Sequence, residues 1–248
     1  MERITSRKNA RIQHLKKLGA SKAYRTECGE FLCDGEKLLE EAVSNGMTVV
    51  SVLYCGEAPE GAKAAENVYE TQRDIIEYVS PMKSPQNVLF TCRMQSDSFI
   101  PRPGEKYIVL EEVQDPGNVG TVMRTARAMG YDCVLLLPGC ADVFSPKAVR
   151  ATMGAVFRQR VCSIKYDSIA AMKSLGVEIY GAALAADSRD IRNVDFNSFA
   201  VCIGSEGRGL SDGLIQMCDE KIIIPMMQDC ESLNAAMAAG IIMWESVR

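Results

Sequence analysis

The feature that most constrains this chain is a pair of apolar strands near its C-terminus, each running into a tight polar loop. The first, residues 200–203, leads into the glycine-rich stretch 204–211. The second, residues 221–224, stops at Pro225, which has no N–H to donate to a neighbouring strand. Loops that follow neighbouring strands form the ligand crevice of an α/β sheet. The pattern therefore predicts a binding site between residues 203 and 226.

The glycines of the first loop argue against a nicotinamide enzyme. Gly204, Gly207 and Gly209 are spaced Gly-x-x-Gly-x-Gly, whereas a dinucleotide site has Gly-x-Gly-x-x-Gly early in the chain. A Gly-rich turn is a weak signal when it stands alone. The alternative is that these glycines only turn the chain.

The 248 residues, 47% of them apolar and 24% charged, suit one large or two modest globular domains. Alternating strands and helices after residue 106 predict an α/β domain with a mainly parallel sheet. Its expected strands are 107–110, 132–137, 160–164, 178–183, 199–203 and 221–224, and its expected helices are 121–129, 146–154 and 168–175. We expect domains at 1–97 and 106–248, joined by a linker at 98–105 that contains Pro101, Pro103 and Gly104.

The first domain shows a second, smaller α/β pattern. The expected helices are 6–18 (ended by Gly19), 36–44 and 74–79, and the expected strands are 30–33, 49–54 and 87–92.

Charge is unevenly distributed along the chain. The net charge is −4, yet residues 1–25 hold eight Lys and Arg residues against Glu2 alone. One interpretation is a solvated helix face, and the other is a patch that binds nucleic-acid phosphates.

Other classes of function are disfavoured. The ten cysteines form no Cys-x-x-Cys pair and the single histidine, His14, lies among basic residues, so no metal site is expected. No apolar run approaches the roughly 20 residues that cross a bilayer, and residues 1–22 lack the apolar core of a signal peptide. We expect a cytoplasmic protein with no membrane association. The last helix, predicted at 232–247, is apolar nearly all round, so a partner subunit would help to cover it.

A third loop completes the pattern. Asp115-Pro116-Gly117-Asn118-Val119-Gly120, followed by Arg124, lies between an expected strand and an expected helix. With Gly-Ser-Glu-Gly-x-Gly-Leu at 204–210, Ile-Pro-Met at 224–226 and Ser-Leu-Asn at 232–234, this order resembles the SpoU (TrmH-like) family of RNA ribose 2′-O-methyltransferases. Residues 144–155 also resemble the family, and residues 6–9 and 31–35 do so more loosely.

The resemblance implies a SPOUT α/β fold with a deep trefoil knot and an N-terminal L30e-like domain that binds RNA substrate. It implies S-adenosyl-L-methionine as the cofactor, RNA as the partner, with ribosomal RNA favoured over transfer RNA, and a homodimer formed through the C-terminal domain. The implied catalytic residues are Asn118, Arg124, Glu206, Ser232 and Asn234. The implied cofactor-binding residues are Gly204, Ile224, Leu233, Leu137, Gly209 and Met226.

Arginine is almost always protonated and is a poor literal base. We therefore expect Arg124 to clamp a phosphate and orient the ribose hydroxyl; the alternative is an ion pair with Glu206. For Ser232 and Asn234 the alternative is helix capping, which can coexist with a catalytic role. The chain departs from the family pattern at Gln228, where glycine is common, and at Ala235. Three rival functions remain: transfer RNA methylation, base methylation, and non-catalytic RNA binding on the same fold.

Overall fold

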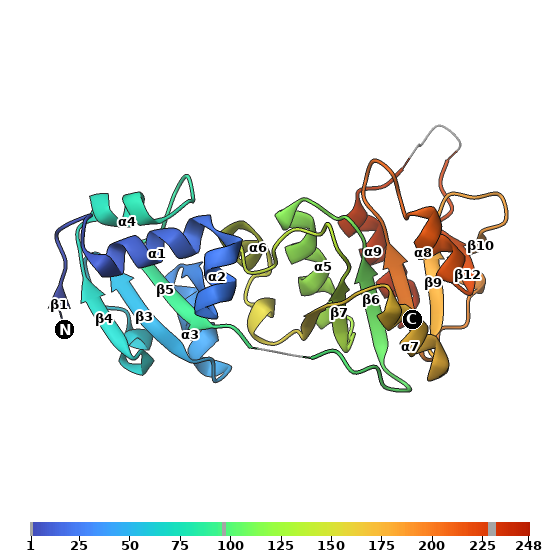
Figure 1. Cartoon of the computed structure of the whole chain (residues 1–248), viewed down its shortest axis with the longest axis horizontal. Helices are drawn as coiled ribbons and strands as arrows, with labels where there is room; N and C mark the ends of the chain where they lie inside the picture. The colour runs from blue at the N-terminus through green and yellow to red at the C-terminus, as the bar shows by residue number, and fades with distance from the viewer. Residues whose placement is uncertain (1, 96–97, 228–231) are drawn as a thin grey trace. The chain divides into compact units, whose positions relative to one another are not determined.

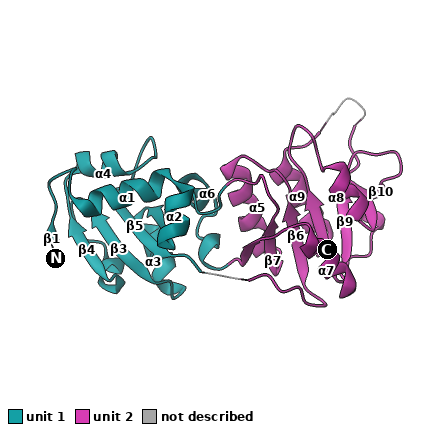
Figure 2. Ribbon diagram, viewed as in Figure 1, with its two compact units in different colours: residues 1–96, 142–158 teal, residues 97–141, 159–248 magenta. Residues whose placement is uncertain are grey.

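A computed structural model of the chain describes residues 2–95, 98–227 and 232–248. It divides into two compact units (Figures 1 and 2): unit 1 is residues 1–96 with 142–158, and unit 2 is residues 97–141 with 159–248. The sequence-based division kept 106–248 together. The structure instead groups residues 142–158 with the N-terminal unit, although this segment connects two strands of unit 2 in sequence.

Unit 1 is built on a five-stranded mixed sheet in the order β1-β4-β3-β5-β2. Strand β5 runs antiparallel to both β2 and β3, whereas β4 is parallel to β1 and β3. The strands are β1 (Glu2–Arg3), β2 (Glu30–Asp34), β3 (Val49–Tyr54), β4 (Asn67–Glu70) and β5 (Val88–Arg93). The helices before residue 96 are α1 (Ala10–Ala20), α2 (Lys22–Cys28), α3 (Glu36–Ser44), η1 (Glu60–Ala64) and α4 (Arg73–Val79).

Different segments of the chain pack on the two faces of this sheet. Helices α1 and α4 contribute Ile12, Leu15 and Ile76 to a buried cluster that also contains Leu32 of β2. Neighbouring side chains on a strand point to opposite faces, so Phe31 lies on the other face. There its ring centroid is 5.0 Å from that of Phe144 and 6.4 Å from that of Phe157. Segment 142–158 therefore packs on the second face.

Ion pairs fix both ends of that segment, which contains α6 (Pro146–Ala151) and η2 (Ala155–Phe157). At one end Arg25, only 4% exposed, places Nε 3.0 Å and Nη2 2.5 Å from the Asp142 carboxylate. At the other end Arg158 pairs with Glu41. A Cβ at Gly154, whose φ is +85°, would collide with the same Glu41 carboxylate. The positive φ favours glycine there, and a larger residue would force the Glu41 side chain to move.

Two predictions at the N-terminus were wrong. Helix α1 begins at Ala10 because the Asn9 side chain caps it, accepting from the Arg11 N–H at 2.8 Å. It also continues through Gly19, where an added Cβ would lie 3.3 Å from Leu32 and Pro81, so this glycine permits close packing rather than ending the helix. Helix α2, which the sequence analysis missed, starts immediately afterwards under a Ser21 cap.

Unit 2 is built on a seven-stranded sheet in the order β10-β12-β9-β11-β6-β7-β8. All six pairings are parallel, which confirms the predicted α/β class. The strands are β6 (Lys106–Leu110), β7 (Cys133–Leu136), β8 (Val161–Ser163), β9 (Glu178–Ala182), β10 (Arg189–Asp190), β11 (Phe199–Ile203) and β12 (Glu220–Ile223). The helices are α5 (Pro116–Ala128), α7 (Asp167–Ser174), η3 (Ile191–Asn193), α8 (Asp212–Met217) and α9 (Ala235–Glu245).

The central strands are buried on both faces, as their continuous apolar runs predict. One face packs on α7 and α8, in a cluster that holds Val109, Ile169 and Leu214. Helices α5 and α9 contact each other, and α9 also contacts β11. Strands β6, β11 and β12 run in the same direction and each is followed by one of the three predicted loops, so the sheet brings all three loops to one edge.

The observed helix boundaries change the secondary structure in which three predicted site residues lie. Helix α5 starts at Pro116, because Asp115 Oδ1 accepts from the N–H groups of Gly117 and Asn118. Asn118 therefore lies in the first turn rather than in a loop, and Arg124 lies mid-helix rather than at its start. Helix α9 starts at Ala235, so Ser232 precedes it. The trefoil knot depends on a stretch that includes residues 228–231, outside the described ranges, and stays a prediction.

Candidate functional site

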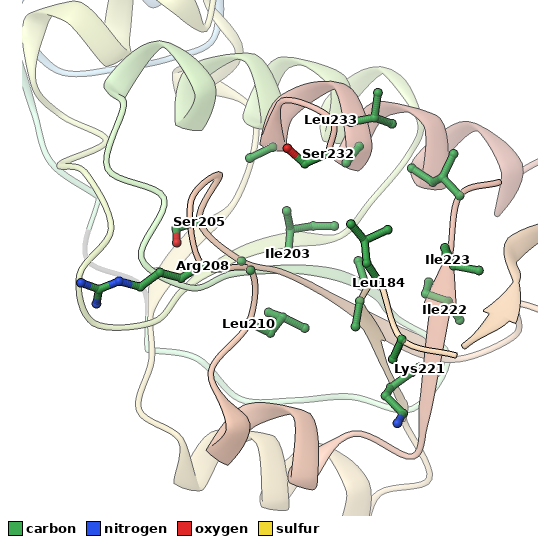
Figure 3. Close-up of a pocket in the computed structure, with 18 of the residues that line it drawn as sticks. Leu184, Ile203, Ser205, Arg208, Leu210, Lys221, Ile222, Ile223, Ser232 and Leu233 are labelled. Carbon is green, nitrogen blue, oxygen red and sulfur yellow. The ribbon is translucent and has the colours of Figure 1, made fainter. Parts of the chain in front are cut away.

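A cavity of about 780 Å³ opens at the carboxyl ends of β9, β11 and β12. Its walls come from the chain after each strand and from the inner side of α9. Figure 3 shows Leu184, Ile203 and Leu233 around the hollow, with the Arg208 side chain directed away from it. The polar residues in the lining are Ser205, Glu206, Arg208, Asp212, Lys221 and Ser232. The site thus combines an apolar interior with a polar border, as ligand pockets commonly do.

The glycine loop forms one wall as a closed hairpin. Ser205 and Gly209 exchange two backbone hydrogen bonds, at 3.2 Å and 2.9 Å. An added Cβ at Gly204 would lie 2.0 Å from the carbonyl carbon of Gly209, which leaves room for glycine only. Gly209 itself has a φ of +68°, a conformation that glycine adopts readily. These two glycines therefore fix the hairpin's shape.

Three predicted catalytic side chains from distant parts of the sequence meet in one hydrogen-bonded cluster. The Asn118 Nδ2 group donates to Glu206 Oε1. Asn234 Nδ2 donates to Asn118 Oδ1 at 3.2 Å. The Asn234 Oδ1 atom accepts from the N–H groups of Ala236 and Met237, so this residue also caps α9. Capping and membership of the cluster coexist, as the sequence analysis allowed.

Arg124 stands apart from that cluster. It lies six residues after Asn118 on α5, and at 100° per residue the two side chains leave the helix about 120° apart. Arg124 is exposed, and within the described ranges no hydrogen bond or ion pair joins its side chain to another residue. The alternative ion pair with Glu206 is therefore not observed. Ser232 and Glu206 both line the cavity.

Five of the six predicted cofactor-binding residues line the cavity: Gly204, Gly209, Ile224, Met226 and Leu233. Leu137 does not, because it is 2% exposed within the cluster on the α7 and α8 face of the sheet. Gln228, the departure from the family pattern, lies outside the described residues.

A buried carboxylate that was not among the predicted site residues lies next to the hairpin. Glu111, directly after β6 and 2% exposed, accepts from Ser211 and from the Tyr166 hydroxyl. That hydrogen bond raises the pKa of Tyr166 to about 12. The signal was present: an acidic residue follows an apolar strand at the predicted crevice. Leu184, Asp212 and Ile215 of the lining were also not singled out.

Among residues 2–95, 98–227 and 232–248, no three His, Cys, Asp or Glu side chains lie close enough together to hold a metal ion. None of the helices in these ranges combines the length and the apolar character that a membrane span requires.

Comparison with known proteins identifies the family. Residues 105–244 match the SpoU rRNA Methylase family, and residues 9–89 match the MRM3-like substrate binding domain. The chain belongs to the SpoU rRNA methylase family. The resemblance inferred from its three loops is thereby confirmed.

Relatives of this SpoU methylase align over nearly its whole length. The 23S rRNA (guanosine(2553)-2′-O)-methyltransferase RlmP of Bacillus subtilis (strain 168) is 33% identical over 247 residues, 98% of each chain. The 23S rRNA (uridine(2479)-2′-O)-methyltransferase of Streptomyces viridochromogenes is 32% identical over 267 residues, 99% of this chain and 92% of that one. A crystal structure of an AdoMet-bound rRNA methyltransferase from Sinorhizobium meliloti superposes with a TM-score of 0.90, at 29% identity, over 99% of this chain and 97% of that one.

Proposed function

We propose that this SpoU methylase transfers a methyl group from S-adenosyl-L-methionine to a ribose 2′-hydroxyl of RNA, with ribosomal RNA as the substrate, in the cytoplasm. One observation carries the proposal: Asn118, Glu206 and Asn234, from three separate segments, form one polar cluster beside the cavity. The names of the Bacillus and Streptomyces relatives support the ribosomal substrate.

The cavity fits the proposed cofactor in size and chemistry. Its volume of about 780 Å³ lies within the roughly 300–1,000 Å³ usual for small-molecule sites. Apolar side chains such as Ile203 and Leu233 suit an adenine ring, and the carboxylates of Glu206 and Asp212 suit the cofactor's positive groups. Gly204, Gly209, Ile224 and Met226 would present backbone groups to it. When bound, S-adenosyl-L-methionine supplies a methyl group already activated by its sulfonium.

The residues of the chain would then act mainly by positioning. The ribose hydroxyl is weakly acidic and must be oriented as it attacks. Asn234 donates to Asn118, Asn118 donates to Glu206, and the α9 cap holds the Asn234 oxygen, so both amides are fixed before substrate arrives. Arg124 and Arg208 are exposed and have no ion-pair partner among the described residues. Both guanidinium groups are therefore available for RNA phosphates.

A homodimer through the C-terminal domain would explain the isolation of Arg124. Helix α9 leaves Met237 60% and Trp244 58% exposed, an apolar face that suits a second copy of the chain. In such a dimer, Arg124 of one subunit can serve the polar cluster of the other.

Mixed dimers test this arrangement. Arg124→Ala and Glu206→Ala proteins, each inactive alone, are co-expressed with different tags and the heterodimer is purified. Action across the interface restores one intact site, so about half of the wild-type activity should return. Action within one chain restores none. A monomeric wild-type protein by light scattering would overturn the dimer proposal.

The basic N-terminus supports RNA binding by unit 1, with one correction. Arg25 is buried with Asp142 and cannot belong to an RNA-binding surface. Arg7 pairs with Asp74 at 3.1 Å. Lys8, Arg11 and Lys17 are exposed, and no ion pair joins them to a carboxylate of the described residues. In addition, Lys16 Nζ lies 3.2 Å from the ring centroid of Tyr78, which places a cation beside an aromatic surface.

Nucleoside analysis tests the reaction itself. Ribosomal RNA and transfer RNA from a deletion strain are treated with the protein and S-adenosyl-L-methionine, digested, and analysed by mass spectrometry. A new 2′-O-methylnucleoside in ribosomal RNA is the expected result. A product in transfer RNA alone would show that transfer RNA, not ribosomal RNA, is the substrate. A methylated base would show that the protein is a base methyltransferase. No product with either RNA would favour a non-catalytic RNA-binding protein.

A further inference from the structure

Glu111 is a buried carboxylate with no part in the chemistry proposed above. Its Oε1 accepts from the Ser211 hydroxyl at 2.7 Å and from the Tyr166 hydroxyl at 2.8 Å, and its Oε2 accepts from the Ser211 N–H at 2.7 Å. The Ser211 Oγ also accepts from the Leu214 N–H at 3.2 Å, so its proton is directed to Glu111. All three contacts are donors, as an ionised carboxylate requires.

These contacts place one residue at both ends of the glycine hairpin. The backbone N–H of Glu111 donates to the Ile203 carbonyl at 2.9 Å, immediately before Gly204. Its side chain holds Ser211, immediately after Leu210. Because Ser211 also caps α8, the same contact sets the start of the helix that brings Asp212 and Ile215 to the cavity wall.

We infer that Glu111 is a positioning residue for cofactor binding: it holds hairpin 204–210 and the start of α8 in the shape that S-adenosyl-L-methionine requires. This rests on the proposed function. A loop that is ordered before binding does not lose that freedom when the ligand arrives, and this raises affinity. Tyr166, whose ring is partly exposed, supplies the third donor. Its raised pKa of about 12 keeps the phenol protonated at physiological pH.

The test compares two carboxylates at opposite ends of β6. Glu111→Gln keeps the shape of the side chain but removes its charge. Glu105→Gln is the matched control, because Glu105 Oε2 also accepts from a tyrosine hydroxyl, that of Tyr107 at 2.5 Å, before the amino end of the strand. Calorimetric titration with S-adenosyl-L-methionine should give a Kd about tenfold higher for Glu111→Gln, in line with the loss of charge-assisted hydrogen bonds, and unchanged for Glu105→Gln.

A second readout needs no ligand. Amide hydrogen exchange of residues 204–211 in the free protein should accelerate in Glu111→Gln and stay at the wild-type rate in Glu105→Gln. The KM for S-adenosyl-L-methionine should rise, whereas kcat at saturating cofactor and the Kd for RNA should stay within twofold of wild type.

Ser211→Ala and Tyr166→Phe extend the test and cover the case in which Glu111→Gln does not fold. Ser211→Ala should raise the cofactor Kd several-fold, because it removes one donor to Glu111 and the α8 cap, and Tyr166→Phe about twofold, because it removes one donor alone. The loss of cofactor-binding free energy in the double variant Glu111→Gln/Ser211→Ala should be smaller than the sum of the losses in the two single variants. If these variants bind the cofactor as wild type does, with unchanged exchange in 204–211, the inference is overturned. If the wild-type protein itself binds no S-adenosyl-L-methionine, the proposed function fails instead.

Discussion

The two units differ in how they carry charge. Unit 1 holds 16 Lys and Arg residues against 14 Asp and Glu, whereas unit 2 holds 12 against 18. In unit 1 the exposed cations Lys8, Arg11 and Lys17 lie on and beside α1, and in unit 2 the polar side chains of the site are tied into a cluster of amides and a carboxylate. This difference suggests a division of labour: unit 1 attracts the RNA backbone, and unit 2 orients one hydroxyl. Arg124 and Arg208 are the exceptions, because they bring positive charge to the acidic unit near its site.

The largest expected effect comes from Arg124→Ala. If unit 2 acts by orientation, losing this cation should lower kcat at least about 100-fold, the scale of a misplaced reacting group. The Kd for S-adenosyl-L-methionine should stay within twofold, because Arg124 does not line the cavity. Single-turnover methylation and calorimetry separate the two quantities. Arg127→Ala, three residues further along α5 and also exposed, is the control for removing one positive charge. A wild-type rate for Arg124→Ala would remove Arg124 from the reaction.

Asn234 allows capping and catalysis to be separated. Aspartate caps helices as well as asparagine does, so Asn234→Asp should leave the melting temperature nearly unchanged. It nevertheless removes the Nδ2 donor to Asn118 and adds a negative charge beside Glu206. We expect kcat to fall about 30-fold, since misorientation at a site costs tens- to hundred-fold in rate. Asn234→Ala should lose both the rate and about 1 kcal/mol of stability. Equal rates for Asn234→Asp and wild type would reduce Asn234 to a cap.

The sequence predicted the fold best where a local pattern agrees with the tertiary environment. The helix at 36–44 and the strand at 49–54 were predicted with the bounds that the structure has, because apolar spacing, Gly35 and flanking polar residues all indicate the same element. It failed where packing decides. Gly19 looks like a helix end but sits under Leu32 and Pro81, and nothing local shows that segment 142–158 leaves unit 2 to cover Phe31.

The site followed the same rule. The motifs named Asn118, Glu206 and Asn234. The parallel sheet brings Asn118 and Glu206 together because β6 and β11 end at one edge, and Asn234 joins them from the start of α9. Leu137 was placed in the site by resemblance, but it follows β7 directly and its side chain packs into the hydrophobic core on the α7 and α8 face of the sheet. Glu111 was missed because its role depends on Ser211 and Tyr166, which are distant in sequence.

Charge reversal on unit 1 tests whether this unit attracts the RNA backbone. Lys8→Glu, Arg11→Glu and Lys17→Glu together should weaken RNA binding about tenfold at moderate salt and reduce the salt slope of the affinity by about 3, one for each lost phosphate contact. The kcat at saturating RNA should not change. Filter binding across a salt series measures the slope. Reversal at Lys37, Lys63 and Lys83, exposed elsewhere on unit 1, gives the matched control. Equal slopes for the two triple variants would make α1 an ordinary solvated face.

The smallest expected effect concerns the buried acid of unit 1, the counterpart of Glu111. Glu30 is 6% exposed, and His14 Nε2 lies 3.4 Å from its Oε2. Burial raises the pKa of Glu30, but hydrogen bonds to His14 and Thr91 outweigh it and lower the pKa overall.

A lowered folded-state pKa adds stability that is fully present above the unfolded value of about 4.5 and is lost as pH falls through the folded value. Glu30→Gln should therefore cost about 1 kcal/mol at pH 7, because the amide oxygen of Gln can still accept a hydrogen bond and only the charge is lost, and flatten the decline in stability below pH 4.5. Urea unfolding at several pH values measures this, with cofactor affinity as the control, since a residue of unit 1 should leave it unchanged. An equally steep decline in the variant would show that Glu30 does not contribute to acid sensitivity.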